Sequence, residues 1–107
     1  MLVVTSSTIY GQKITATLGL VKGTTVRARH LGKDILAIMR NIVGGEILEY
    51  TKILAESREH ALDRMIEEAK ALGADAIVDI RFSTSNIAQG AAEVLVYGTA
   101  VTLEEGN

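Results

Sequence analysis

The sequence contains no cysteine, no proline and no tryptophan among its 107 residues. Without cysteine, the chain cannot form disulfides, use a thiolate nucleophile or build a cysteine-based zinc or iron–sulfur site. No apolar run approaches the roughly 18 residues of a membrane span, and residues 1–7 lack the basic and apolar regions of a signal peptide. We therefore expect a cytoplasmic protein without a membrane segment.

Aromatic residues are also scarce, with one phenylalanine and three tyrosines, whereas 48% of the residues are hydrophobic. The core is therefore expected to be aliphatic. No repeat, proline-rich linker or low-complexity stretch divides the chain, so residues 1–107 are predicted to form a single domain.

Charge is unevenly distributed along the chain. Residues 1–45 carry six bases and one acid, a net of +5, while residues 46–107 carry five bases and twelve acids, a net of −7. If the two parts occupy opposite flanks, the basic side of one subunit could steer onto the acidic side of the next. If they interleave in space, this asymmetry disappears.

The first half of the chain begins with strand patterns. Residues 2–5 form a short apolar strand, and residues 13–30 alternate, with Leu18, Leu20 and Val26 predicted on one face. A two-residue hairpin at Lys22-Gly23 would turn the arginines that follow inward. One strand bent at Gly19 or Gly23, or a three-residue loop, avoids this, and the pattern leaves these two open.

Helical periodicity follows. Residues 33–43 have a broad apolar stripe that stops at Gly44-Gly45, which predicts a short helix. Residues 46–72 predict a longer amphipathic helix with Gly73 as its C-terminal cap. Gly44-Gly45 fits a tight link between the two helices better than an anion site, because acidic residues already occupy the next turn.

The last part predicts two strands, residues 76–83 and 93–103, separated by a loop over residues 84–92. The final strand is apolar on both faces. The helices of so small a domain cover one face of a sheet, so the second face needs another cover, and a partner subunit is the simplest candidate. The side chains predicted to form that homo-oligomer interface are Leu95, Tyr97, Val101 and Leu103.

Four segments add a resemblance: Gly-Lys-Asp at 32–34, Arg-Asn-Ile-Val-Gly-Gly at 40–45, Ala-Leu-Gly-Ala-Asp-Ala-Ile-Val at 71–78, and Tyr-Gly-Thr-Ala-Val at 97–101. In this order and spacing the chain resembles the YbjQ family of small uncharacterised proteins. The resemblance implies a dodecin-like α+β subunit, with an antiparallel sheet carrying a short and a long helix on one face, assembled into a pentameric ring. It also implies heavy-metal binding, with a divalent ion as the cofactor. This chain has Thr24 where the family often has an acid and Asp79 where it often has glycine.

The metal candidates are few. Glu56, His60 and Asp63 are four and three residues apart on a predicted helix, so they could converge on a divalent ion. The alternative is a solvated charged face that includes Arg64. His30 is a further candidate, but Arg27 and Arg29 disfavour a cation beside it, and a hydrogen-bonded, partly buried histidine is the competing interpretation.

Asp34 and Arg40 lie six residues apart, too far round a helix to pair with each other. Asp34 fits either an interface salt bridge or a helix N-terminal acid. We hypothesise that Arg40 reaches the acidic flank of an adjacent subunit.

Other functional classes have weaker support. The serines and threonines have no cue that pairs them with a histidine, so no catalytic constellation is predicted. A nucleic-acid binder would use Lys22, Arg27, Arg29 and Lys33, but that stretch lacks stacking aromatics and the acidic helix would repel phosphate. A purely structural oligomer without a ligand remains the alternative to a metal- or ligand-binding ring.

Overall fold

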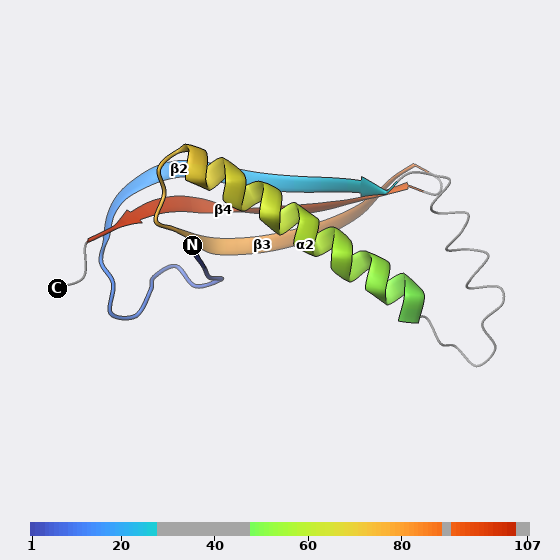
Figure 1. Cartoon of the computed structure of the whole chain (residues 1–107), viewed down its shortest axis with the longest axis horizontal. Coiled ribbons are helices and arrows are strands. Elements are labelled where there is room, and N and C mark those ends of the chain that lie inside the picture. Colours follow the sequence, from blue (N-terminus) through green and yellow to red (C-terminus); the bar gives the residue numbers. More distant parts are fainter. Residues whose placement is uncertain (28–47, 89–90, 105–107) are drawn as a thin grey trace.

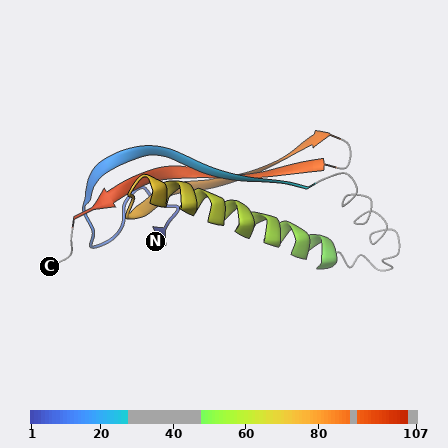
Figure 2. The ribbon, with the colours of Figure 1, turned by 45° about the horizontal axis from the view of Figure 1, so that its top comes forward.

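The computed structural model describes residues 1–27, 48–88 and 91–104. The described elements are β1 (Leu2–Val3), β2 (Ile14–Arg27), α2 (Leu48–Ala71), β3 (Ala76–Ala88) and β4 (Ala91–Leu103). The strands form one sheet in the order β1-β3-β4-β2, and α2 crosses one face of it obliquely (Figure 1). Figure 2 shows the resulting two layers, helix and sheet. The α+β prediction is confirmed, and the predicted short helix at residues 33–43 lies outside the described residues.

The sheet is mixed, so the prediction of a purely antiparallel sheet is wrong. β2 and β3 both pair antiparallel with the central strand β4, but β1 pairs parallel with β3, with Leu2 opposite Ala76. The reason is the route of the chain. β1 and β2 lie at opposite edges of the sheet, so residues 4–13 must cross from one edge to the other instead of closing a hairpin.

Residues 14–27 form one continuous strand, which decides between the bent strand and the three-residue loop over this range. The predicted face assignment along it holds for Leu20 and Val26, which share one face, but is wrong for Leu18. The register with β4 shifts between Thr17 and Gly19, and Gly19 has a φ of 128°, which glycine adopts readily. Leu18 consequently packs against the core under the helix, whereas Leu20 beyond the shift is exposed.

β3 and β4 extend further than predicted. The loop expected at residues 84–92 does not form, because β3 continues to Ala88 and β4 begins at Ala91. Pairs such as Thr84 with Val94 keep the polar residues of β3 in the ladder. Strands of 13 residues are more than twice the usual length of about 5–6, so this hairpin is unusually long.

α2 buries a narrow stripe of small and medium side chains against the sheet. Ser57, Ala61, Met65 and Ala69 recur every fourth residue and are fully buried. The predicted cap is confirmed: Gly73 has a φ of 80°, Gly73 N–H donates to Lys70 O, and Ala74 N–H donates to Ala69 O. The buried residues of this helix-side core are Val21, Ala61, Met65, Ala69, Ile77, Ile80, Val94, Val96 and Ala100.

α2 comes closest to the sheet at Gly23. A Cβ atom at Gly23 would overlap the carbonyl oxygen of Ala61 and lie 2.6 Å from the backbone nitrogen of Met65. Two residues further along β2, Thr25 Oγ1 donates a hydrogen bond of 3.1 Å to Ser57 O, and this bond is buried. The helix therefore rests directly on the β2 backbone.

The opposite face of the sheet has its own small core at one end. Ala76, Val78 and Val101 are buried there beneath residues of the crossing segment, Val4 and Ile9, together with Ile14 and Leu103. We call the two sides of the sheet the helix face and the outer face. This end of the outer face is thus covered by the chain itself.

Asp79 sits at a second irregularity. Its φ is 55°, and the register of β3 with β4 shifts by one residue between Val78 and Arg81. Val78 therefore packs on the outer face and Ile80 on the helix face, although they are two residues apart. Ser7 Oγ donates to Asp79 Oδ1 at 2.9 Å, and Asp79 N–H donates to Ser6 O at 3.0 Å.

We predict that Gly23→Ala destabilises the fold by on the order of 3 kcal/mol, because all three atoms nearest to the added Cβ belong to the α2 backbone. Urea unfolding at fixed protein concentration measures the effect. Thr17→Ala is the matched control, since Thr17 is an exposed residue of the same strand outside residues 20–27, and a change within about 0.5 kcal/mol is expected. Equal stability of Gly23→Ala and wild type would contradict the close approach.

A second prediction concerns the left-handed backbone at Asp79. Asp79→Val should lose about 1–2 kcal/mol, since a β-branched residue disfavours this conformation. Asp79→Gly should be the better tolerated of the two, because glycine adopts a φ of 55° without strain. Thermal unfolding of both variants and of Ser7→Ala, which removes only the hydrogen bond, separates the two contributions; an equal loss in the valine and glycine variants would refute the backbone argument.

Candidate functional site

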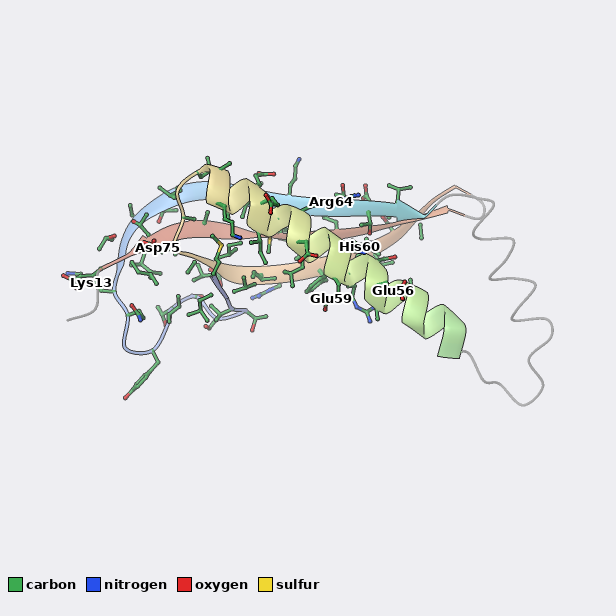
Figure 3. The ribbon with its side chains drawn as sticks, viewed as in Figure 1. Lys13, Glu56, Glu59, His60, Arg64 and Asp75 are labelled. Carbon is green, nitrogen blue, oxygen red and sulfur yellow. The ribbon has the colours of Figure 1, made fainter. Side chains whose placement is uncertain are left out.

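The three predicted metal residues of α2 do not form a site. Glu56, His60 and Asp63 are all exposed, and Figure 3 shows Glu56 and His60 along α2. Within residues 1–27, 48–88 and 91–104, no three His, Asp or Glu side chains are grouped so that they could hold a metal ion. This arrangement corresponds to the solvated charged face considered as the alternative. His30, Asp34 and Arg40 lie outside the described residues.

The four predicted interface side chains separate into two pairs. β4 does alternate as predicted, with Val94, Val96 and Ala100 on the helix face. Val101 is only 1% exposed, however, and Leu103 is partly buried beside it in the outer-face core. Their expected partner-subunit cover is corrected here: residues 4–14 of the same chain provide it, because that segment crosses the sheet at this end.

Leu95 and Tyr97 lie beyond this cover, on what we call the open half-sheet: residues 20–27 of β2, 81–88 of β3 and 91–99 of β4. Leu95 is half-buried and Tyr97 is 38% exposed. The cross-strand pairs place Tyr97 between Lys22 on β2 and Arg81 on β3. The outer face of the open half-sheet is therefore a mixed surface, with an aromatic ring between two cations.

The open half-sheet also exposes apolar side chains that the sequence pattern did not single out. Leu20 is 66% exposed and Val26 is 55% exposed on the outer face, and Phe82 is 47% exposed on the helix face. Phe82 remains uncovered because α2 packs mainly over β2 and β4 and only slightly over β3. Glycine at position 19 was the available sequence signal for Leu20, since glycine inside a strand pattern often marks a bulge.

Two arginines fix the edges of this surface. Arg64 of α2 reaches over the edge of the sheet, and its Nη1 donates to Thr24 O of β2. Arg81 Nη1 donates to Thr5 O at 3.1 Å and to Ile80 O at 2.8 Å, which ties β3 to the crossing segment.

The described helix is not long and apolar enough to cross a membrane.

Comparison with known families supports the resemblance noted above. The YbjQ family model, described as "Putative heavy-metal-binding", matches residues 1–104. The chain belongs to the YbjQ family.

Curated relatives in this family include UPF0145 proteins from archaea and bacteria. The chain is 53% identical to one from Methanosarcina acetivorans over 103 residues, covering 96% of this chain and 97% of the relative. It is 58% identical to one from Pyrococcus furiosus, with 97% and 91% coverage. A relative from Clostridioides difficile is 51% identical over 107 residues, covering 100% of this chain and 96% of the relative.

The fold is also found in a solved structure. A protein of unknown function of the DUF74 family from Pediococcus pentosaceus superposes with a TM-score of 0.65, covering 97% of this chain and 98% of that one. Sequence identity is 17%, so this similarity concerns the fold alone.

The heavy-metal description of the YbjQ family does not fit the residues that are described in this subunit. The acids and His60 on α2 are exposed and ungrouped, and the chain has no cysteine to supply the soft ligand that many heavy metals prefer. A metal site formed by one subunit therefore has no support in residues 1–27, 48–88 and 91–104.

We expect His60→Ala combined with Glu56→Gln to leave the number of zinc ions bound per subunit unchanged, because these side chains have no third ligand beside them. Zinc content after equilibration and desalting, measured by elemental mass spectrometry on wild type and variant, checks this. Loss of one ion per subunit in the variant would restore the helix as a metal site.

Proposed function

We propose that the working form of this YbjQ-family protein is a cyclic homo-oligomer in the cytoplasm, a pentamer as the family resemblance implies. One observation carries the proposal: the open half-sheet exposes Leu20, Val26, Phe82 and Tyr97 around β4 although the rest of the sheet is covered on both faces. Exposed apolar surface of this kind, rimmed by polar residues, is typical of interaction sites.

The shape of the subunit supports the same proposal. The principal-axis extents are 57 × 25 × 16 Å and the Cα radius of gyration is 17.3 Å. A compact chain of this length would have a radius of gyration of roughly 13 Å. A subunit this thin has little interior of its own, so burial against a neighbour would add to its stability.

The size of the apolar contribution is limited. Each of the four exposed side chains is already about half-buried, so complete burial would contribute about 1–2 kcal/mol apiece. Association costs an estimated 4–15 kcal/mol in lost translational and rotational freedom. Together the four side chains would contribute about 4–8 kcal/mol, which offsets only the lower part of that range, so polar or backbone interactions would be needed to offset the rest.

We infer that the assembly itself is the functional unit, acting as a scaffold. Metal or small-ligand binding is the second candidate, favoured by the description of the YbjQ family. Since no described group within one subunit fits a metal ion, its ligands would come from more than one subunit or from residues outside the described ranges.

Native mass spectrometry of the purified protein, before and after incubation with zinc, copper and a chelator, tests both candidates. We expect a closed oligomer of one size, a pentamer, whose mass does not depend on the chelator. A fixed number of ions per subunit, removed by the chelator, would favour metal binding over the scaffold. A stable monomer at micromolar concentration would overturn the proposal.

A further inference from the structure

Both lateral edges of the open half-sheet lack a neighbouring strand within the described part of the chain. β2 is the last strand on one side over its whole length. On the other side, β1 pairs only with Ala76 and Ile77, and the backbone bonds of the following segment reach β3 as far as Ile80. Residues 81–88 of β3 and 20–27 of β2 are thus two exposed edges of equal length, each with backbone N–H and C=O groups available for pairing.

The position of the helix makes these two edges complementary. Each subunit provides three strands here, a width of about 14 Å at the usual strand spacing, but a single helix about 10 Å across. α2 crosses the sheet obliquely, packs mainly on β2 and β4 and only slightly on β3, and leaves Phe82 of β3 exposed (Figure 1). If β3 of one copy lay beside β2 of another, the second subunit would cover part of the exposed Phe82 side chain.

The two flanks carry different charged groups, although the β3 flank also has one cation, Arg81, at the start of its edge. On the β2 flank lie Lys22 and Arg64, and residues 1–27 contain no acid. On the β3 flank of α2 lies Glu59, on the side of the helix opposite Arg64 (Figure 3). Contact between the two flanks would bring Arg64 of one copy toward Glu59 of the next, whereas contact between two β2 flanks would bring cations together.

We propose that copies of this chain join edge to edge, the β2 edge (residues 20–27) of one subunit pairing with the β3 edge (residues 81–88) of the next to form one continuous sheet, with Phe82 as the apolar anchor. The inference rests on the proposed homo-oligomer and names its interface. Because two different edges meet, the contact is head-to-tail, and it closes into a ring when the rotation between subunits allows.

Backbone hydrogen bonds along this joint would supply the interactions that the apolar side chains alone lack. β2 and β3 run in the same direction, since both are antiparallel to β4, so in a ring whose axis follows the strands the joint is parallel. Arg64 does not block it, because Thr24 O has a second lone pair for a neighbouring N–H. Lys22 and Arg81 both oppose Tyr97, so without a stagger Lys22 of one subunit would lie beside Arg81 of the next. A stagger of two residues, of the kind that closure of a sheet requires, separates them.

Disulfide trapping tests this pairing directly, because the chain has no cysteine of its own. Thr24 and Val26 on β2 and Ser83 and Ser85 on β3 all point to the outer face, since Thr24 and Ser83 both oppose Leu95 of β4. Within one subunit, the β2 and β3 positions are two strand spacings apart, about 10 Å, and a disulfide spans less than about 7 Å between Cα atoms. Any disulfide between them must therefore join two subunits.

The four double-cysteine variants, each with one β2 and one β3 position, allow for the stagger. We expect at least one of them to give, after mild oxidation, a ladder of covalent oligomers on a non-reducing gel whose highest band equals the native oligomer. The four single-cysteine variants should stay unlinked. Covalent dimers from a single-cysteine variant would show a symmetric joint and overturn the proposal.

This outcome is separable from failure of the proposed function. A native mass of one subunit overturns both inferences, whereas an intact oligomer without a disulfide in any double-cysteine variant overturns only the edge pairing.

Phe82→Ser provides a second measurement. We expect its oligomer to dissociate at a protein concentration at least tenfold higher than that of wild type, measured by light scattering across a dilution series. Tyr10→Ser is the matched control, because Tyr10 is a fully exposed aromatic residue outside both edges. If wild type and Phe82→Ser dissociated at the same protein concentration, Phe82 would not be part of the interface.

Discussion

The contact of α2 with the backbone of β2 at Gly23 determines how this subunit is built. Since glycine at this position leaves no side chain between helix and strand, Ala61 and Met65 lie against the sheet, and α2 is held over β2 and β4. Thr25 and Ser57 add a buried hydrogen bond at the same place. The position of the helix then decides which part of the sheet remains uncovered, namely the β3 side with Phe82.

Bulges in β2 and β3 distribute the apolar residues of these strands between the two faces. At Gly19 and at Asp79 the register with β4 shifts, so that β2 and β3 each change which residues face the helix. β4 lies between them without a bulge, and its alternation is regular. The consequence is an outer face that is apolar and covered near Val101 but mixed and open around Tyr97. Asp79 occupies a left-handed backbone position, with a φ of 55°, that suits glycine.

More features of this subunit point to assembly with other chains than to binding of a ligand. The exposed apolar side chains, the thin shape and the two edges that have no neighbouring strand in the described part of the chain all concern contact with another chain. The predicted metal ligands, by contrast, belong to a charged helix face on which Glu56, His60 and Asp63 point to solvent without gathering. The description of the YbjQ family is therefore better examined in the assembled oligomer than in the subunit.

Local patterns in the sequence were sufficient for the α+β class, for the helix ending at Gly73, for the alternation of β4 and for the family, because each depends on residues near one another in the chain. Tyr97 could be placed on the outer face for the same reason. The exposure of Leu20 and Phe82 could not be predicted, since it depends on bulges set by pairing with β4 and on where α2 rests. The burial of Val101 could not be predicted either, because residues 4–14 cover this side chain only as a result of β1 and β2 lying at opposite edges of the sheet. Period and capping are local properties of the chain, whereas face, cover and free edges arise from contacts between distant segments, and those were decided by the tertiary structure alone.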